Sequence, residues 1–213
     1  MSLEIFHFNA LAVNTYLYYD ETGEGIVIDP GMCDAQECAS FLQFIDSNDL
    51  KIKKIIATHP HIDHVLGNGY CVSALHAPLL MHDAGMKIYE RSVAYGVAFG
   101  MGCSQEDFPI PDYFLREGDE ITFGHQKLEV IYTPGHADGS VCLLDRSHRL
   151  IFVGDLIFRG GIGRSDLPTG NSALLYQSIQ NHIFTLDDEV TIYPGHGPET
   201  TVGFEKKYNP FFN

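Results

Sequence analysis

The stretch His59-Pro60-His61-Ile62-Asp63-His64 holds four side chains that can bind a metal within six residues. It directly follows the apolar run Ile52–Thr58, which we interpret as a β-strand. Side chains at these spacings can converge on a turn that leaves a strand, whereas a straight strand or a single helix face would separate them. Burying them without a compensating charge would be unfavourable. Because imidazole and carboxylate ligands together suit zinc, iron or manganese, the stretch predicts a metal site.

Three further metal-binding side chains each follow a run that we also interpret as a strand. They are His136 after Lys127–Tyr132, Asp155 after Leu150–Val153 and His196 after Val190–Tyr193. Loops at one end of neighbouring strands are the usual place for a site in proteins built from sheets and helices. A histidine after a glycine means little alone, but four such loops in one chain predict one shared centre.

The remaining pattern divides into two comparable halves. Further strands are predicted at Leu3–Phe8, Asn14–Tyr19, Gly25–Asp29, Glu120–Phe123 and Val141–Leu144. Apolar residues at helical spacing predict one helix over Ala35–Ile45 and another over Leu174–Leu186, with Asn171 as its N-cap. The stretch Asp83–Pro111 lies between the halves and is either a flap over the substrate or an ordinary helix and loop.

Composition limits the class of protein. The chain has 213 residues, 45% of them hydrophobic, and 13 basic against 28 acidic residues give a net charge of −15. We expect one globular domain over residues 1–213, without a membrane span because no apolar run reaches about 18 residues. The acidic balance disfavours nucleic acid and anionic membranes as partners. The N-terminus lacks a signal-peptide pattern and the five cysteines form no C-x-x-C pair, so we expect reduced thiols in a cytoplasmic protein.

With these residues the sequence resembles the metallo-β-lactamase superfamily, whose ordered pattern is H-x-H-x-D-H, H, D and H. The resemblance extends from Asp29-Pro30-Gly31 to the C-terminus. It implies an α+β fold, a four-layer αββα sandwich, with two divalent metal ions between the sheets, zinc by default and iron or manganese as alternatives. The resemblance implies that one metal is held by His59, His61 and His136, that the second is held by Asp63, His64 and His196, and that Asp155 bridges the two.

Within the superfamily, three segments are most similar to the glyoxalase II group, especially to its short members. These segments are Arg159–Pro168, Pro194–Thr201 and Tyr208-Asn-Pro-Phe-Phe. The similarity implies hydrolysis of a small-molecule thioester of the hydroxyacylglutathione type by a hydroxide that bridges the metals, with Asp63 as a possible proton acceptor. Full-length glyoxalase II carries a helical C-terminal domain that contacts glutathione. Only 17 residues follow His196 (213 − 196), so we expect that domain to be missing and leave the thiol open.

Two other activities are compatible with the pattern. Persulfide dioxygenases share the fold and a similar Gly-Arg-Ser/Thr-Asp loop but use a single iron, and His136-Ala-Asp-Gly-Ser140 is compatible with them. A dinuclear lactonase would differ only in substrate. The presence of both His64 and His196 favours two metals, and a non-catalytic binding protein would be expected to have lost ligands. The sequence does not predict the oligomeric state.

Two further residues have two interpretations each. Asp29 either orients a histidine ligand through its second ring nitrogen or simply forms a turn. Arg164 either binds an anionic group of the substrate or pairs with Asp166, two residues further along.

Overall fold

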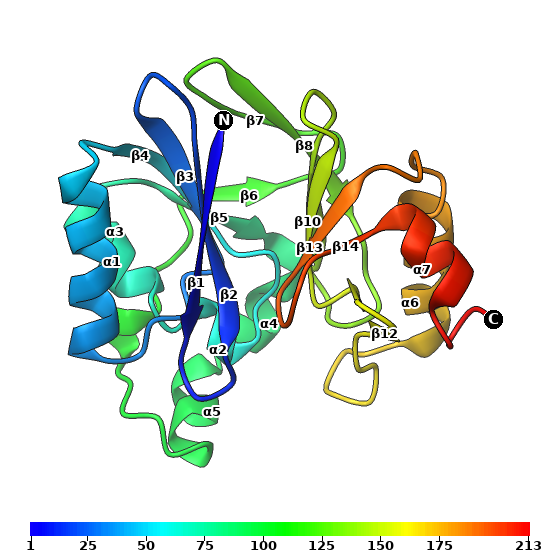
Figure 1. Cartoon of the computed structure of the whole chain (residues 1–213). Helices are drawn as coiled ribbons and strands as arrows, with labels where there is room; N and C mark the ends of the chain where they lie inside the picture. Colours follow the sequence, from blue (N-terminus) through cyan, green and yellow to red (C-terminus); the bar gives the residue numbers. More distant parts are fainter.

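Two six-stranded sheets lie face to face, with helices on both outer sides (Figure 1). The computed structural model describes residues 1–213. The strands of the first sheet follow the order of the chain: β1 (Ser2–Phe8), β2 (Val13–Tyr19), β3 (Glu24–Ile28), β4 (Lys51–Ile56), β5 (Leu79–His82) and β6 (Tyr113–Leu115). The pairs β1–β2 and β2–β3 are antiparallel, and the pairs from β3 to β6 are parallel.

The second sheet has the spatial order β14-β13-β10-β9-β8-β7. Its strands are β7 (Glu120–Phe123), β8 (Gln126–Tyr132), β9 (Val141–Asp145), β10 (Leu150–Gly154), β13 (Thr191–Pro194) and β14 (Thr200–Thr201). Only the pair β10–β13 is parallel. A small separate hairpin, β11 (Ile157–Phe158) and β12 (Gly161–Ile162), follows β10.

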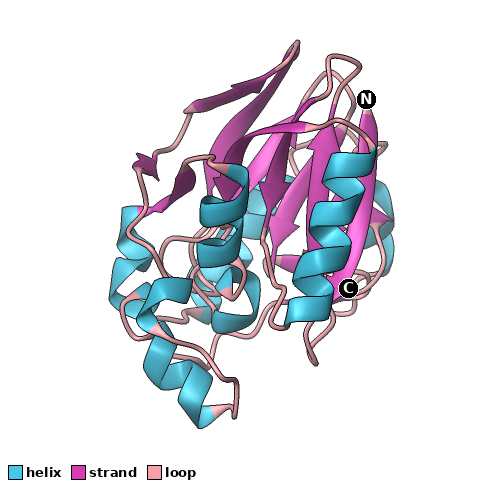
Figure 2. Cartoon of the chain, turned by 90° about the vertical axis from the view of Figure 1, so that its left-hand side faces the viewer, coloured by secondary structure: helices cyan, strands magenta, loops and turns pink.

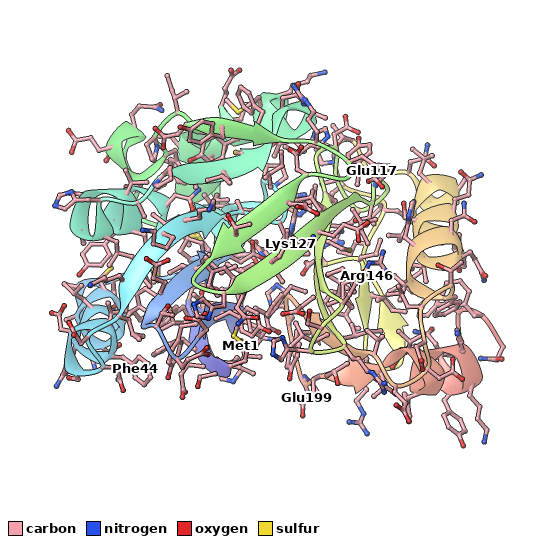
Figure 3. The ribbon with its side chains drawn as sticks, turned by 90° about the horizontal axis from the view of Figure 1, so that it is seen from above. Met1, Phe44, Glu117, Lys127, Arg146 and Glu199 are labelled. Atoms are coloured by element: carbon pink, nitrogen blue, oxygen red, sulfur yellow. The ribbon has the colours of Figure 1, made fainter.

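The helices divide between the two outer faces. On the side of the first sheet lie α1 (Ala35–Ser47), α2 (Ile62–Val65), α3 (Asn68–Leu75), α4 (Met86–Tyr89) and α5 (Ser92–Ala98), and on the other side lie α6 (Ser172–Ser178) and α7 (Val202–Tyr208). Figure 2 shows helices in front of the first sheet, and Figure 3, seen from above, shows the strands between two outer sets of helices. None of these helices is both long and apolar enough to cross a bilayer.

Alternation along the strands explains the layers. On β2, Tyr16 and Tyr18 pack in the cluster between the sheets, while Leu17 belongs to the cluster under the first set of helices. A third cluster joins the outer face of the second sheet to α6, with Ile151 and Leu175 among its buried members. Because successive side chains of a strand point to opposite faces, each sheet supplies apolar groups to two clusters. The three clusters separate four layers, so the predicted αββα sandwich is confirmed.

The predicted elements differ from the observed ones mainly in the first sheet and in the helix after Asn171, and the short elements α3, α7, β11, β12 and β14 were not predicted either. Every predicted strand exists within two residues of its predicted bounds, but β5 and β6 were not predicted, because runs of four and three residues give too little pattern. The predicted stretch Asp83–Pro111 therefore lies between two strands of the first sheet. The helix predicted over Leu174–Leu186 begins at Ser172, where the Asn171 side chain accepts a hydrogen bond from the Leu174 N–H as expected, and it changes to a π-helical turn over Ile179–Ile183.

Asp20 stabilises the turn between β2 and β3, and its low pKa predicts that part of the protein's stability is lost in acid. Burial acts to raise the pKa of Asp20, but hydrogen bonds from the backbone N–H of His125 and from Thr22 outweigh it and lower this pKa to about 2. The unfolded chain has an ordinary aspartate pKa of about 3.9, so the stabilisation is complete above about pH 5 and is lost as pH falls towards 2. We expect Asp20→Ala to lower the free energy of unfolding by about 1–3 kcal/mol at pH 7. This difference in unfolding free energy between the wild type and the variant should become smaller below pH 4.

Urea unfolding of both proteins between pH 7 and pH 3 measures the difference in their free energies of unfolding. Effects of acid that both proteins share cancel in this difference. Asp46→Ala is the control, because Asp46 is an exposed aspartate on α1. A difference that stays constant over the whole pH range would contradict the role of the carboxylate.

Candidate metal centre

The loops after β4, β8, β10 and β13 bring all seven predicted metal ligands to one end of the sandwich. In Figure 1 this is the lower end, where α2, α4, α5 and β12 gather. The first loop carries four of them, and α2 begins within it at Ile62. His59 and His61 therefore precede the helix, whereas Asp63 and His64 lie on it. The histidine-rich stretch is a turn running into a short helix rather than a turn alone.

The first group consists of His59, His61 and His136. One ligand atom from each lies within 4.8 Å of the others. The ring centroids are 4.9 Å apart for His59 and His61, 4.8 Å for His59 and His136, and 4.5 Å for His61 and His136. Three imidazoles this close together can supply three of the four corners of a tetrahedral metal site and leave the fourth open.

The second group consists of Asp63, His64 and His196, and it also lies within 4.8 Å. Nε2 of His64 is 3.6 Å from Asp63 Oδ2, and Nε2 of His196 is 3.1 Å from the same oxygen. Asp155 lies between the two groups. Its Oδ1 is 3.4 Å from His64 Nε2, and its Oδ2 is 3.6 Å from His136 Nε2 and 3.8 Å from His196 Nε2. One carboxylate thus faces both groups.

Hydrogen bonds on the far side of the rings fix their orientation. His64 Nδ1–H donates to Asp29 Oδ2 (2.9 Å), His136 Nδ1–H to the Arg164 carbonyl (2.8 Å) and His196 Nδ1–H to the Leu11 carbonyl (3.0 Å). Asp29 is therefore in the orienting position considered for it, and it also accepts hydrogen bonds from Thr58 N–H and Oγ1. With Nδ1–H engaged in this way, each ring in its neutral form has its lone pair on Nε2, which points to the centre.

The buried polar atoms test whether the residues fit metal ions. Nε2 of His59, His64 and His136 and Oδ1 of Asp155 are buried and have no hydrogen-bond partner. Buried polar atoms are almost always paired, and a divalent cation in each of the two groups would satisfy these four atoms. A donor set of imidazoles and carboxylates without cysteine fits zinc, iron or manganese.

The two groups differ in their affinity for protons. Burial lowers the pKa of His61 to about 4 and holds the pKa of His59 and His136 below the ordinary value, so these rings are neutral at pH 7. Burial also acts to lower the pKa of His64, but the nearby carboxylates, Asp63 first, raise it well above the usual value. Metal uptake by the second group therefore has to release a proton, which the first group does not require.

Sequence reasoning missed the residues that hold the His196 loop. From β2, the Asn14 amide donates to the carbonyls of Pro194 (2.9 Å) and Gly197 (2.8 Å). The Tyr16 hydroxyl donates to the same Pro194 carbonyl (2.6 Å). Both side chains are buried, so the first sheet positions a ligand loop of the second. The one available signal was the amide side chain of Asn14 at the start of a tyrosine-rich strand.

Asn14→Ala tests this positioning. Without the two amide hydrogen bonds the His196 loop loses its support, and we expect affinity for one metal to fall about 10–100-fold while the other stays tightly bound. Competition with a chromophoric chelator resolves the two affinities. Asn48→Ala, which removes an asparagine at the exposed end of α1, is the matched control. Equal weakening of both metals would refute selective support of the His196 loop.

A pocket of about 530 Å³ opens over the centre. The ligands His61, Asp63, His136, Asp155 and His196 line its floor. Ile88, Tyr95 and Phe99 form part of its wall, so the stretch predicted as a flap or an ordinary helix does border the site. Arg164 also lines the pocket, but its guanidinium pairs with Asp166 at 3.0 and 2.9 Å. Binding of a substrate anion by Arg164 stays a prediction.

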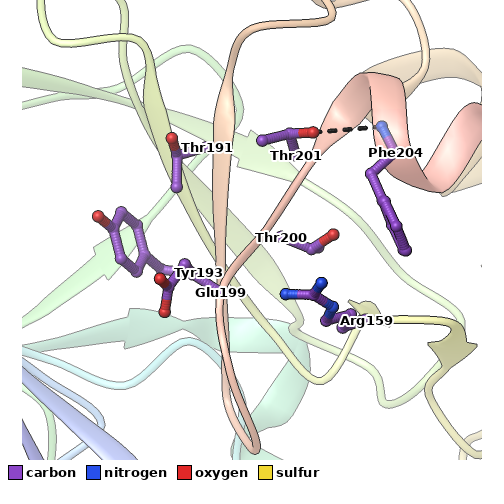
Figure 4. Close-up of a pocket in the computed structure, with 7 residues that line it drawn as sticks. All are labelled: Arg159, Thr191, Tyr193, Glu199, Thr200, Thr201 and Phe204. Carbon is purple, nitrogen blue, oxygen red and sulfur yellow. Dashed lines mark hydrogen bonds between the residues drawn. The ribbon is translucent and has the colours of Figure 1, made fainter.

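A second hollow of about 440 Å³ lies between β13, β14 and α7 (Figure 4). Its lining residues are Arg159, Thr191, Tyr193, Glu199, Thr200, Thr201 and Phe204. Arg159 lies over the Phe204 ring, 5.0 Å from its centroid. No histidine or cysteine lines this hollow, so the hollow with the means for metal chemistry is the one over the ligand groups.

The fold is a four-layer αββα sandwich, and at one end of its strands lie two ligand groups that share one carboxylate. This combination defines a class of metal-dependent proteins. This chain belongs to the metallo-β-lactamase superfamily, whose family model matches residues 8–196.

Three relatives show how similar the chain is to known members. The hydroxyacylglutathione hydrolase GloC of Haemophilus influenzae is 32% identical over 100% of this chain and 99% of its own. The solved structure of TTHA1623 in a di-iron-bound form has a TM-score of 0.87 and 34% identity, covering 98% of this chain and 99% of that one. The structure of the B3 metallo-β-lactamase BLEG-1 also has a TM-score of 0.87, at 27% identity and with 100% of both chains covered.

Proposed function

We propose that this chain is a metal-dependent hydrolase of thioesters of the hydroxyacylglutathione type. The observation that carries the proposal is the pair of ligand groups sharing Asp155 at the floor of a pocket. The similarity to GloC over the full chain supports the choice of substrate class. The identity to GloC, 32%, is higher than the 27% identity to the B3 lactamase, so we give it more weight.

The two ligand groups indicate which residues would hold each metal. His59, His61 and His136 would hold one metal, Asp63, His64 and His196 the other, and Asp155 would contact both. Two such ions, when bound, polarise a carbonyl and lower the pKa of water. Asp63 lines the pocket, and hydrogen bonding and charge from its histidine neighbours outweigh burial and lower its pKa below the ordinary value. Asp63 is therefore ionised at neutral pH, and its carboxylate can accept the proton of the attacking water.

The pocket favours a leaving group that needs no proton. A thiolate with a pKa of about 8.5 departs without a strong general acid, whereas an amine does not. Among the lining residues, Tyr95 has the only hydroxyl and no lysine or cysteine is present. Thioesters therefore suit the site better than amides.

The test joins metal analysis to turnover. Protein purified without added metal is assayed for metal content and for hydrolysis of S-lactoylglutathione. About two metals per chain, with turnover removed by His59→Ala and kept by the control His7→Ala on exposed β1, would support the proposal. About one iron per chain, oxygen uptake with glutathione persulfide and no hydrolysis would replace it by a dioxygenase. Hydrolysis of lactones or β-lactams alone would also overturn it.

A further inference from the structure

The walls of the pocket are apolar on two sides. One wall includes Ile88, Tyr95 and Phe99, and Leu11 from the β1–β2 turn also lines the pocket. The other comes from the β11–β12 hairpin and the loop after it, with Phe158, Ile162, Leu167 and Pro168. Besides the metal ligands of the floor, Arg164 is the only charged residue of the lining, and the Tyr95 hydroxyl is the only other polar side-chain group. A molecule that reaches the metals therefore passes mainly along apolar side chains.

Two residues at the rim leave apolar surface open to water. Leu11 is 53% exposed and Phe99 is 67% exposed, although both line the pocket. Exposed apolar surface next to a pocket is typical of a binding site whose occupant covers it. This exposure favours an occupant that is apolar along the walls.

The walls provide one positive charge, and it already has a carboxylate partner. Arg164 is the only lysine or arginine among the lining residues, and both of its carboxylate contacts go to Asp166. A carboxylate placed against the apolar lining residues would lose water, and it could pair with Arg164 only in competition with Asp166, which is unfavourable. Thiols such as glutathione carry carboxylates a few bonds from sulfur. The carboxylates of such a thiol are therefore expected to lie outside the pocket, and the acyl part of the thioester is expected to occupy the pocket.

We propose that the pocket selects thioesters with an apolar acyl chain, which lies between the Phe99 and Phe158 walls while the thiol part remains at the mouth. This rests on the proposed thioester hydrolysis and changes the acyl part of its preferred substrate: a small hydroxyacyl group is turned over, but less efficiently than an aliphatic one. Phe99 is a specificity-determining residue, because its ring extends the wall beyond the buried Ile88.

The test uses thioesters of one uncharged thiol, N-acetylcysteamine, with the metal-loaded protein. The acyl series is acetyl, lactoyl, butyryl and hexanoyl, with succinyl as the charged match of butyryl. Burial of a methylene raises kcat/KM about threefold, so we expect butyryl to exceed acetyl about tenfold. Succinyl should fall at least tenfold below butyryl. A flat series, or succinyl equal to butyryl, would overturn the selectivity and leave thioester hydrolysis standing.

Variants place the selectivity on the wall. We expect Phe99→Ala to lower the ratio of kcat/KM for hexanoyl over acetyl about tenfold. The control Ile110→Ala removes a side chain that is 83% exposed and does not line the pocket, so the ratio should stay the same. An unchanged ratio in Phe99→Ala would remove this residue from the proposal.

A binding measurement separates the two proposals. In the analogues, a methylene between sulfur and carbonyl prevents hydrolysis, and calorimetry gives their affinities for the metal-loaded protein. Tighter binding of the hexanoyl analogue than of the acetyl and succinyl analogues, with no thioester hydrolysed, would mean that the pocket proposal holds and the hydrolase proposal fails. Equal affinities for the three would refute the pocket proposal whatever the turnover.

Discussion

Asp155→Asn is expected to lower kcat/KM about 10³-fold or more and to leave the protein with fewer than two metals per chain. Asp155 is the carboxylate whose oxygens face Nε2 atoms of both ligand groups, and only Asp63 among the other ligands is negatively charged. The substitution removes charge that offsets two divalent cations. It also places an amide, with its N–H donors, where the histidine lone pairs converge. Changes behind a ligand already cost 10–100-fold, so loss of a shared ligand should cost more.

Elemental analysis and steady-state kinetics on one preparation measure both effects. Asp188→Asn makes the same charge change at an exposed aspartate that pairs with Lys206, and it should keep both metals and full turnover. Retention of two metals and of activity within tenfold by Asp155→Asn would mean that this carboxylate is not shared by the metals.

Much of the fold could be predicted because its signals are local. The strands alternate or run apolar, and the metal-binding side chains follow them directly, so a reader of the sequence can place His136 and Asp155 at strand ends without knowing the sheet order. The short β6 was missed because it is exposed on two of its three residues and is defined by its pairing with β5. Pairing between distant strands leaves no local pattern.

The surroundings of the ligands could not be predicted, because they depend on contacts across the whole chain. Asn14 and Pro194 are separated by 180 positions, and Leu11 and His196 by 185. In each of these contacts a backbone carbonyl accepts the hydrogen bond, and a carbonyl is the same for every residue type. Asp29 was an exception, since a carboxylate at a strand end was visible in the sequence and does contact His64.

The centre also depends on groups that are too small to be recognised as functional. The ligand loops of both sheets approach so closely that a side chain between them has no room. At Gly163 an added Cβ would lie 1.9 Å from the Asp155 carbonyl oxygen and 3.2 Å from His136 Nδ1. In a sequence pattern such glycines are interpreted as ordinary loop residues, although these glycines set the distance between the ligands.

Gly195→Ala is expected to weaken metal binding more than 100-fold and to lower turnover accordingly. An added Cβ would lie 2.2 Å from Asp155 Oδ1 and 2.6 Å from His64 Cε1, among the ligands of both groups. The loop cannot easily move away, because Gly195 N–H donates to the Gly154 carbonyl and its own carbonyl accepts from Asn14 N–H, both at 2.7 Å. The backbone of Gly195 lies outside the left-handed region, so alanine adds bulk without backbone strain. Asp155 or His64 then has to shift from its ligand position.

Metal affinities by chelator competition and unfolding of the metal-free proteins separate this effect from a general loss of stability. Crowding in the interior costs about 1–3 kcal/mol, so the metal-free variant should still fold. Gly161→Ala is the matched control, because its added Cβ would meet only Phe158 at 3.8 Å. Two metals bound by Gly195→Ala with the affinity of the wild type would show that the ligands tolerate a methyl group between them. In that case the two groups could not form one centre with Asp155 shared at its middle.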